Sequence, residues 1–482
     1  MSASELSSGE SIDRRGELKA VLAMSAPIVI STCSPMVMRV ADFAFVATLG
    51  TETQAAILPA QMTLWCYIAF AMGLVTAINT FAAQALGRGR LRDCGAYAWQ
   101  SLYLSAFLGL AGLGLWFLFP AIFSLVNHEP RVQALEVLYT RISVWAILPT
   151  VAAQALGAFF NGIHRPRVTM MGAVESNALN IFLNYALIFG AFGFPKLGFA
   201  GAAWGTVIAA AYLTLRLLAT LWWGETRWTC ATRETWRLDG VKLRALCRVG
   251  LPQGLQWLSE VTVWAVFCTQ LIGRFGTVEL AATNVAWQYV RIGFMPIIGV
   301  GQAVTSMVGK AIGQNDPSRA MRYARLGALT AFAYVTVLSM LYCLKGGSLV
   351  GLFNGDATVI RIGTKIMFCV AAFQIFDVLG QIYYHALRGA GDTKWPMVMI
   401  TVSHWLVVVG GGSVVVWLKP EWGSLGPWVV ASVLISFTGV LLWGRWRSQA
   451  WTRIALFAAD DDAISESSSA EAGHSVTEEA TA

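Results

Sequence analysis

Residues 72–87 read MGLVTAINTFAAQALG, and residues 298–313 read IGVGQAVTSMVGKAIG. The two stretches align without a gap at a shift of 226 residues. The same shift aligns LGTETQAAILPAQ at 49–61 with FGTVELAATNVAW at 275–287. Because the matches extend over tens of residues in one frame, they indicate that the chain is built from two similar halves.

The composition places most of this repeat in a lipid bilayer. Hydrophobic residues make up 56% of the 482 residues, charged residues 13%, and the mean hydropathy is +0.59. A soluble domain carries roughly 25% charge, so the composition excludes a soluble enzyme and a secreted disulfide scaffold. The pI near 9.0 does not indicate nucleic-acid binding, because the basic residues lie scattered in short loops. The sequence has no C-x-x-C pair, and its histidines are not spaced like metal ligands, so a zinc site is not expected.

Apolar runs separated by short polar breaks predict twelve transmembrane helices, six in each half. Their expected bounds are 19–46, 54–84, 95–120, 131–159, 168–191, 197–223, 245–272, 280–311, 319–345, 358–386, 395–417 and 424–447. Six is an even number, so both halves insert with the same orientation. The predicted fold class is therefore an all-α polytopic membrane protein whose two six-helix bundles are related by a pseudo-two-fold axis along the membrane normal.

Lysine and arginine set the expected orientation. Most basic residues outside the spans fall on one side if the N-terminus is cytoplasmic, so the positive-inside rule places both termini in the cytoplasm. The polar N-terminus shows no removable signal peptide. The expected segments are a cytoplasmic N-terminal segment (1–18), an N-lobe (19–223), a cytoplasmic linker loop (224–244), a C-lobe (245–447) and a disordered acidic cytoplasmic tail (448–482).

Acidic residues inside the spans are the first candidates for a functional site, because charge in a membrane interior is costly. Glu260 and Asp377 are expected near mid-depth, where a carboxylate either carries a proton or binds a hard cation. Asp42 lies in the first span, and Glu175 in the fifth is a secondary candidate. An ion pair that only holds helices together is the alternative for each.

Other polar residues in the spans could support these acids. Arg39 precedes Asp42 by three residues, a spacing that allows pairing, and Arg291 lies inside the eighth span. Both are possible counter-ions. Asn180 and Asn184 are four residues apart and share a helix face, where their amides could ligate a cation, bind a protonated acid or join helices.

The order of several motifs resembles the multidrug and toxic compound extrusion (MATE) transporters, closest to the NorM-like branch. They are VADFAFVATLG (40–50), ALNIFLNYALIFG (178–190), KLGFAGAAWGT (196–206), GLPQGLQWLSEVTVW (250–264), PIIGVGQAVTSMVGKAIGQND (296–316) and FQIFDVLGQIYYHALRGAGDTKWP (373–396). The resemblance covers residues 18–447. It implies that Glu260 and Asp377 form the acidic pair of a C-lobe cation site, and that Asp42, Asn180, Asn184 and Thr206 form an N-lobe polar cluster.

The resemblance further implies a secondary active multidrug efflux transporter that couples inward sodium or proton flow to export of bulky, often cationic, organic compounds. Sodium at Glu260 and Asp377 is favoured, although Phe373 replaces a tyrosine seen in sodium-type members. We expect no cofactor, no enzymatic activity, a monomer, and a multi-pass location in the plasma membrane, as in a bacterial inner membrane. A lipid-linked oligosaccharide or cell-wall precursor flippase of the same superfamily is the alternative.

Overall fold

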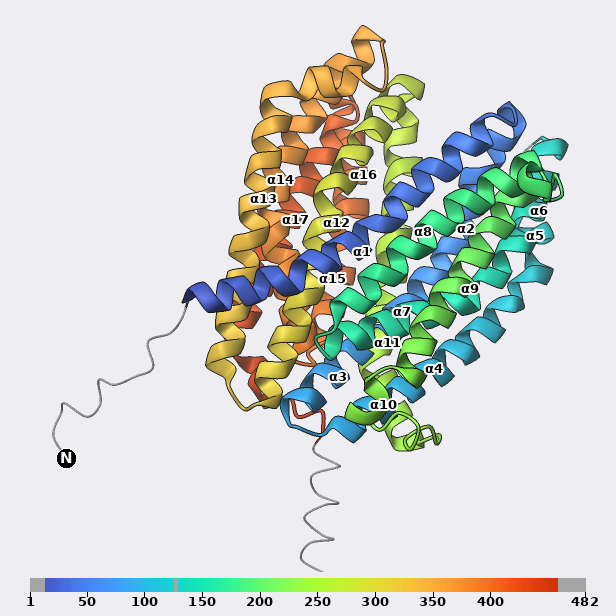
Figure 1. The fold of residues 1–482 in the computed structure, drawn as a ribbon. Coiled ribbons are helices and arrows are strands. Elements are labelled where there is room, and N and C mark those ends of the chain that lie inside the picture. Colours follow the sequence, from blue (N-terminus) through green and yellow to red (C-terminus); the bar gives the residue numbers. More distant parts are fainter. Residues whose placement is uncertain (1–13, 125–128, 458–482) are drawn as a thin grey trace, which may run out of the picture.

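The computed structural model describes residues 14–124 and 129–457, and this part of the chain is helical, without a strand (Figure 1). The N-lobe contains α1 (Arg14–Ala47), α2 (Thr51–Val75), α3 (Ile78–Gly87), α4 (Leu91–Leu113), α5 (Leu115–Ser124), α6 (Pro130–Ser143), α7 (Ile147–Gly162), α8 (Pro166–Phe189) and α9 (Phe199–Trp223). After the short α10 (Thr226–Thr229), the C-lobe contains α11 (Gly240–Val266), α12 (Thr277–Gly313), α13 (Pro317–Gly351), α14 (Ala357–Gly389), α15 (Lys394–Ser403), α16 (Gly412–Leu418) and α17 (Leu425–Arg447).

Each of the twelve predicted spans corresponds to one helix or to consecutive helices of this set. Within the described residues, nine helical stretches are long and apolar enough to cross a membrane. The pair α4 and α5, bent by 45°, makes a tenth. The other two predicted spans are α8 and α11, which lie in the same bundles as the rest. They carry intramembrane polar residues, among them Glu175 and Glu260, which make them less apolar.

Local sequence explains where several helices begin. Proline occupies the first turn of α6, α8 and α13, a position at which its missing N–H is not needed. Asp239 caps α11 by accepting from the amides of Val241 and Lys242. Asp356 caps α14 through the amides of Thr358 and Val359, and these bonds hold the pKa of Asp356 below its ordinary value. Acidic caps therefore mark the starts of two C-lobe helices.

The two lobes meet at one end of the molecule and diverge toward the other. Figure 1 shows them side by side at the end that holds α3 and α10, and separated at the opposite end. Contacts between the lobes join α2 with α11, α1 with α12, and α3 with α12. In the repeat, α2 and α3 together correspond to α12, and α1 corresponds to α11. The contacts α2–α11 and α1–α12 are therefore equivalent under the two-fold relation that the repeat predicts. We call the joined end the predicted cytoplasmic end, after the orientation given by lysine and arginine.

Glycine allows the backbones to approach closely at this end. A Cβ atom on Gly73 of α2 would lie 2.8 Å from the carbonyl oxygen of Gln253 on α11. A Cβ atom on Gly87 of α3 would overlap the carbonyl oxygen of Lys310 on α12. Gly87 and Gly313, aligned by the repeat, also face each other. Gly73, Gly87 and Gly313, three of the glycines shared by the two halves of the repeat, are therefore points at which the lobes touch.

The ends of the fold differ from the predicted segments. The first helix begins at Arg14, inside the predicted N-terminal segment, whose residues 1–13 lie outside the described chain. The predicted disordered tail starts too early, because residues 448–457 pack on the bundle. Trp451 is buried against Trp446, with ring centroids 4.4 Å apart, and Phe457 is 1% exposed. Apolar aromatic residues explain this docking; residues 458–482 lie outside the described chain.

Candidate functional site

The N-lobe brings together three of the residues that the sequence singled out. Asp42 on α1 is 3% exposed, and Asn180 and Asn184 on α8 are fully buried. The Asn184 side-chain amide donates to Asp42 Oδ1 and, at 3.2 Å, to Asn180 Oδ1. Gly205 on α9 packs against the Asn184 side chain, where a Cβ atom would overlap its oxygen. A carboxylate is therefore held between α1 and α8 by an amide ladder, with α9 closing one side.

Two further residues surround this cluster. Tyr139 on α6 is buried within electrostatic reach of Asp42, and its hydroxyl accepts from Gln61 Nε2 on α2 at 3.2 Å. Thr206, which the resemblance assigns to the cluster, donates its hydroxyl to Ala202 of its own helix at 3.1 Å. The structure thus adds Tyr139, which the sequence analysis did not single out. A hydroxyl-bearing aromatic residue in a charged stretch of span four is the signal that could have found it.

The possible pair between Arg39 and Asp42 is an electrostatic interaction without a salt-bridge contact. No ion pair joins them in the described chain; the Arg39 guanidinium lies over the Trp65 ring, 5.5 Å from its centroid. Arg39 lies within electrostatic reach both of Asp42 and of Arg291 on α12, the other basic candidate. The three-residue spacing allowed contact, but the indole face of α2 offered the guanidinium a better-placed partner. Asp42 is therefore held by amides and not by a salt bridge.

Glu175 has a partner elsewhere on the N-lobe. Its carboxylate pairs with Arg216 of α9 at 3.2 Å and accepts from the Tyr212 hydroxyl at 3.0 Å. Both partners lie one turn apart on α9, so the contact joins α8 to α9. This arrangement matches the alternative of an ion pair that holds helices together.

The C-lobe brings the other acidic pair together. Glu260 on α11 and Asp377 on α14 are half-buried and interact electrostatically. Gln381, one turn after Asp377, approaches its carboxylate at 3.5 Å. One turn before Glu260, the buried Gln256 has an oxygen without a hydrogen-bond partner in the described chain. Two carboxylates and an unsatisfied amide oxygen are the donor chemistry that a hard monovalent cation or a proton requires.

An aromatic cluster adjoins this acidic pair. Trp264, one turn after Glu260, lies 4.9 Å from Trp287 between ring centroids, and Trp287 lies 5.5 Å from Trp428. Phe373, one turn before Asp377, stacks on Trp428 at 6.3 Å. The Trp428 indole also donates to Thr283 at 3.3 Å. The faces of aromatic rings attract cations, as carboxylates do. The acidic pair and the adjoining rings therefore both favour a positively charged ligand.

Polar contacts close the predicted cytoplasmic end, and we call their residues the interlobe seal. Its members are Thr76, Asn79, Thr80 and Gln84 of the N-lobe and Gln253, Ser306, Arg388 and Gly389 of the C-lobe. Arg388 is 4% exposed and donates to Thr76 Oγ1 at 2.8 Å and to Gln253 Oε1 at 2.5 Å. In return Thr80 donates to the Arg388 carbonyl oxygen at 2.9 Å.

Comparison with known proteins identifies the family. The family model described as MatE matches residues 27–186 and 258–411, one stretch in each lobe. The chain belongs to the MatE family. This confirms the resemblance on which the two-lobed fold and the transporter class were expected.

MatE proteins of similar length include curated bacterial relatives. The chain is 28% identical over 443 residues to a probable multidrug resistance protein NorM of Brucella suis, covering 89% of this chain and 93% of the relative. It is 28% identical over 444 residues to multidrug resistance protein PmpM of Pseudomonas aeruginosa, covering 89% and 90%. The chain is thus a multi-pass membrane protein with bacterial multidrug-resistance relatives.

Solved MatE-type structures share the fold. A structure titled as the outward-facing conformation of a multidrug resistance MATE family transporter matches with a TM-score of 0.82 at 20% identity, covering 91% of this chain and 97% of that one. A MATE crystal structure in complex with MaL6 matches with a TM-score of 0.80 at 22% identity, covering 91% and 98%. The predicted two-bundle architecture is confirmed.

The interlobe seal of this MatE chain escaped the sequence analysis. Its residues are single polar side chains near the ends of spans. An arginine at such a position is ordinarily expected to extend its guanidinium to the membrane surface. The signal that was present lies in the repeat: the glycines shared by both halves sit among these polar residues. Close backbone approach at those glycines predicts that neighbouring polar groups meet across the interface.

Proposed function

We propose that the chain exports bulky organic cations, coupled to inward flow of sodium or protons, by alternating access of its two lobes. Family membership and the multidrug-resistance relatives support the transporter class. The observation that carries the substrate preference is the Glu260–Asp377 pair beside the aromatic cluster of Trp264, Trp287, Trp428 and Phe373.

The electrostatics of the acidic pair supports coupling. Two carboxylates at one poorly solvated site cannot both stay charged without a cation or a shared proton. Sodium is our first candidate for this pair, because the two carboxylates and the free Gln256 oxygen offer hard ligands. A proton is the alternative. Either ion would weaken the binding of an organic cation at the same lobe, and linkage makes that weakening reciprocal.

The N-lobe cluster supports a second, separate role in coupling. Asp42 is buried near Asn184 and Tyr139, and Arg39 acts on it only at a distance, without a salt-bridge contact in the described chain. An acid in this setting can exchange a proton or a cation without first breaking a salt bridge. We propose that Asp42, with Asn180 and Asn184, responds to the coupling ion in the N-lobe while Glu260 and Asp377 do so in the C-lobe.

The interlobe seal supports alternating access. Hydrogen bonds and close glycine contacts join the lobes at the predicted cytoplasmic end, while the opposite ends diverge (Figure 1). This corresponds to an outward-facing arrangement in a bacterial inner membrane with both termini in the cytoplasm. Breaking the seal and joining the opposite ends would expose the same sites to the cytoplasm.

The test is efflux from proteoliposomes under an imposed sodium gradient or an imposed pH gradient. Glu260→Gln and Asp377→Asn retain shape but remove charge, and each should reduce gradient-driven efflux of a lipophilic dye cation at least about tenfold. Glu175→Gln is the matched control, because it neutralises an intramembrane carboxylate that is already paired with Arg216. Full efflux by both C-lobe variants under either gradient would refute the mechanism.

The flippase alternative is not favoured. A pyrophosphate-linked substrate requires several cations deep in the membrane. Arg39 lies within electrostatic reach of Arg291, and the interactions resolved for Arg39 include no other arginine. The curated relatives carry multidrug-resistance names. Rescue of a cell-wall precursor flippase mutant by this chain, without dye efflux, would reverse this preference.

A further inference from the structure

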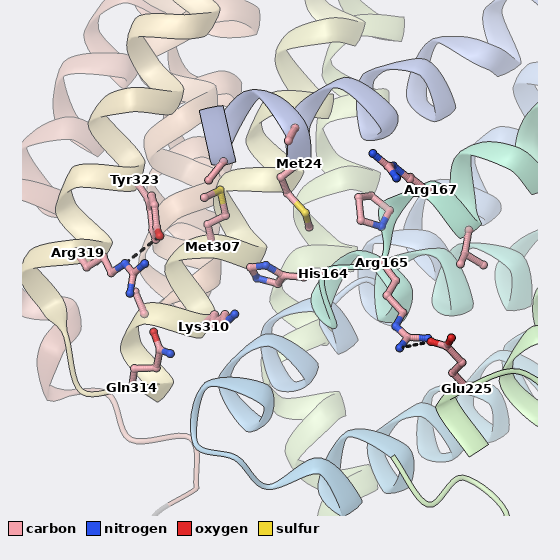
Figure 2. Close-up of a pocket in the computed structure, with 15 residues that line it drawn as sticks. Met24, His164, Arg165, Arg167, Glu225, Met307, Lys310, Gln314, Arg319 and Tyr323 are labelled. Atoms are coloured by element: carbon pink, nitrogen blue, oxygen red, sulfur yellow. Dashed lines mark hydrogen bonds and ion pairs between the residues drawn. The ribbon is translucent and has the colours of Figure 1, made fainter. Parts of the chain in front are cut away.

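A cavity of about 860 Å³ opens between the lobes at the predicted cytoplasmic end. Its N-lobe wall is the loop and first turn of α8, residues 164–168; its C-lobe wall is the end of α12 and the start of α13. The first turns of α1 cover it from a third side. Figure 2 shows side chains from both lobes around one space. An occupant of this cavity would contact both lobes at once.

The cavity is strongly cationic. Arg167, Lys310 and Arg319 line it, and none of the three has a carboxylate partner within residues 14–124 and 129–457. Arg165 pairs with Glu225, the one carboxylate in the described lining, at 2.8 Å. Arg319 donates to the Tyr323 hydroxyl at 2.9 Å, which leaves its positive charge uncompensated. The lining therefore carries an excess of three positive charges.

The C-terminal segment has the opposite charge. Residues 458–482 contain neither lysine nor arginine. Their acidic residues are Asp460, Asp461, Asp462, Glu466, Glu471, Glu478 and Glu479. This is the chain's own polyanion, and a soluble partner is not needed to supply one.

The segment follows Phe457, which packs on α3 and α4 at the end of the molecule where the cavity opens. Phe457, the last described residue, lies 6.0 Å from Phe81 and 5.8 Å from Tyr97 between ring centroids, with the Arg88 guanidinium 4.8 Å over its ring. Arg88 follows Gly87, whose backbone contacts that of Lys310. From this point 25 further residues can extend over at most about 80 Å, so the chain is long enough to reach the cavity.

We propose that the acidic C-terminal segment, residues 458–482, docks in this cavity. The charges favour an extended polyanion over a single phosphate headgroup, because they are spread around the lining. Figure 2 shows Lys310 and Arg319 on one side and Arg165 and Arg167 on the other. Tethering raises the local concentration of the segment to about the millimolar range, so modest affinity suffices.

The decisive experiment is zero-length carbodiimide crosslinking of the full chain, read by mass spectrometry. Carbodiimide joins a lysine amine directly to a carboxylate, so docking predicts links from Lys310 to tail acids. Lys345 and Lys419, expected on the opposite side, should give none. Mixing light and heavy isotope-labelled protein separates links within one chain from links between chains; docking predicts links within one chain.

Two variants separate docking from mere proximity. The double variant Arg167→Gln with Arg319→Gln leaves Lys310 reactive but removes two positive charges. At low salt it should lower the yield of crosslinks from Lys310 to tail acids about fivefold. In the parent chain, 1 M salt should lower that yield by a similar factor. Arg274→Gln with Arg361→Gln removes two charges from the opposite side and should leave the yield unchanged. An unchanged yield in the first double variant, or equal loss in both, would overturn the proposal.

Anionic lipid is the competing occupant, and the same assay decides it. In nanodiscs of phosphatidylcholine alone the Lys310 links should persist. If phosphatidylglycerol at about one-third of the lipid abolishes them at constant ionic strength, the cavity takes headgroups in preference to the tail, and the proposal is overturned. These outcomes do not depend on transport, so they stand apart from the test of the Glu260–Asp377 mechanism.

Discussion

Asp42 shows how much one side chain can depend on a single amide. Its buried carboxylate receives the Asn184 amide, whose second hydrogen bond goes to Asn180 at 3.2 Å. When an ionised group in a poorly solvated site loses a hydrogen-bond donor, its desolvation is no longer compensated, and the folded state is destabilised by about 1–3 kcal/mol or more. Asn184 therefore favours the ionised state of Asp42, although the asparagine itself has no charge.

We expect Asn184→Leu to change ion coupling as well as stability. The variant leaves Asp42 without its donor, so the carboxylate should hold a proton more tightly and the pH or sodium dependence of efflux should shift. The measurement is efflux in proteoliposomes across a series of pH and sodium values, with melting temperature recorded alongside.

Asn177→Leu is the matched control for this change. Asn177 lies on the same helix and donates to the Ser34 carbonyl of α1 at 2.7 Å, with no carboxylate involved. Both variants should have a lower melting temperature, but only Asn184→Leu should alter the pH or sodium dependence of efflux. Identical ion dependence in the two variants would show that the amide ladder serves packing alone.

At the scale of helices, the closeness of α3 to α12 depends on Gly87. A Cβ atom there meets the Lys310 carbonyl oxygen and lies 2.9 Å from Gly313 Cα, so both obstacles are backbone. Backbone in two packed helices cannot rotate away as a flexible side chain would, and overpacking of this kind costs about 1–3 kcal/mol. The penalty applies only while the lobes are joined at this end.

Gly87→Ala should therefore bias the transporter away from the closed seal. We expect faster hydrogen–deuterium exchange in residues 76–87 and 306–313 and slower efflux. Gly444→Ala on α17 is the control, because a Cβ atom there meets nothing within 4 Å. Alanine is also the better helix former by about 1 kcal/mol, so this control should fold at least as well. Unchanged exchange in Gly87→Ala would contradict the role assigned to the contact.

Hydropathy and the repeat were sufficient to predict the helices, because both depend on local composition. Even α8 and α11, which polar residues make less apolar, were found from their place in the six-helix halves. The site was predictable only in part. Asn180 and Asn184 share a face by spacing alone, whereas the position of the Arg39 guanidinium over the Trp65 ring depends on tertiary packing. The seal was not predictable from single residues, since each of its bonds joins helices far apart in sequence.

At the scale of the whole molecule, His164 connects the lobes through a group that titrates. It lies in the loop before α8, and its Nε2 approaches the Ser306 carbonyl oxygen of α12 at 3.4 Å. Burial, together with the nearby Lys310, lowers the pKa of His164 to about 4, although the hydrogen bond to Ser306 acts in the opposite direction. Arg165, Arg167, Arg319 and Glu225 are the other charged groups lining this space.

The sign of the resulting pH effect follows from linkage. With the lobes joined, His164 stays neutral down to about pH 4, whereas in water its pKa is about 6.5. The joined arrangement therefore has its full stability above pH 6.5 and loses it as the pH falls from 6.5 toward 4. Exchange in residues 306–313 should rise between pH 7.5 and pH 5.5, after correction for the intrinsic pH dependence of exchange.

His164→Gln should remove this rise while keeping a polar contact to Ser306. The control is His404→Gln, whose imidazole bonds to Ile400 of its own helix and lies away from the seam between the lobes. That variant should keep the parent pH response. A parent-like response in His164→Gln would mean that another group is responsible.

Arg388 gives the joined arrangement an electrical property. Its guanidinium is held by the neutral oxygens of Thr76 and Gln253, with no carboxylate bound to it in the described chain. Such a charge responds to an electric field as a full elementary charge, at about 2.3 kcal/mol for each 100 mV traversed. A cell interior that is negative pulls it inward, so moving it outward across one-fifth of the field would cost about 0.5 kcal/mol per 100 mV. The resting voltage of the cell would then set, together with the ion gradients, how often the two lobes separate.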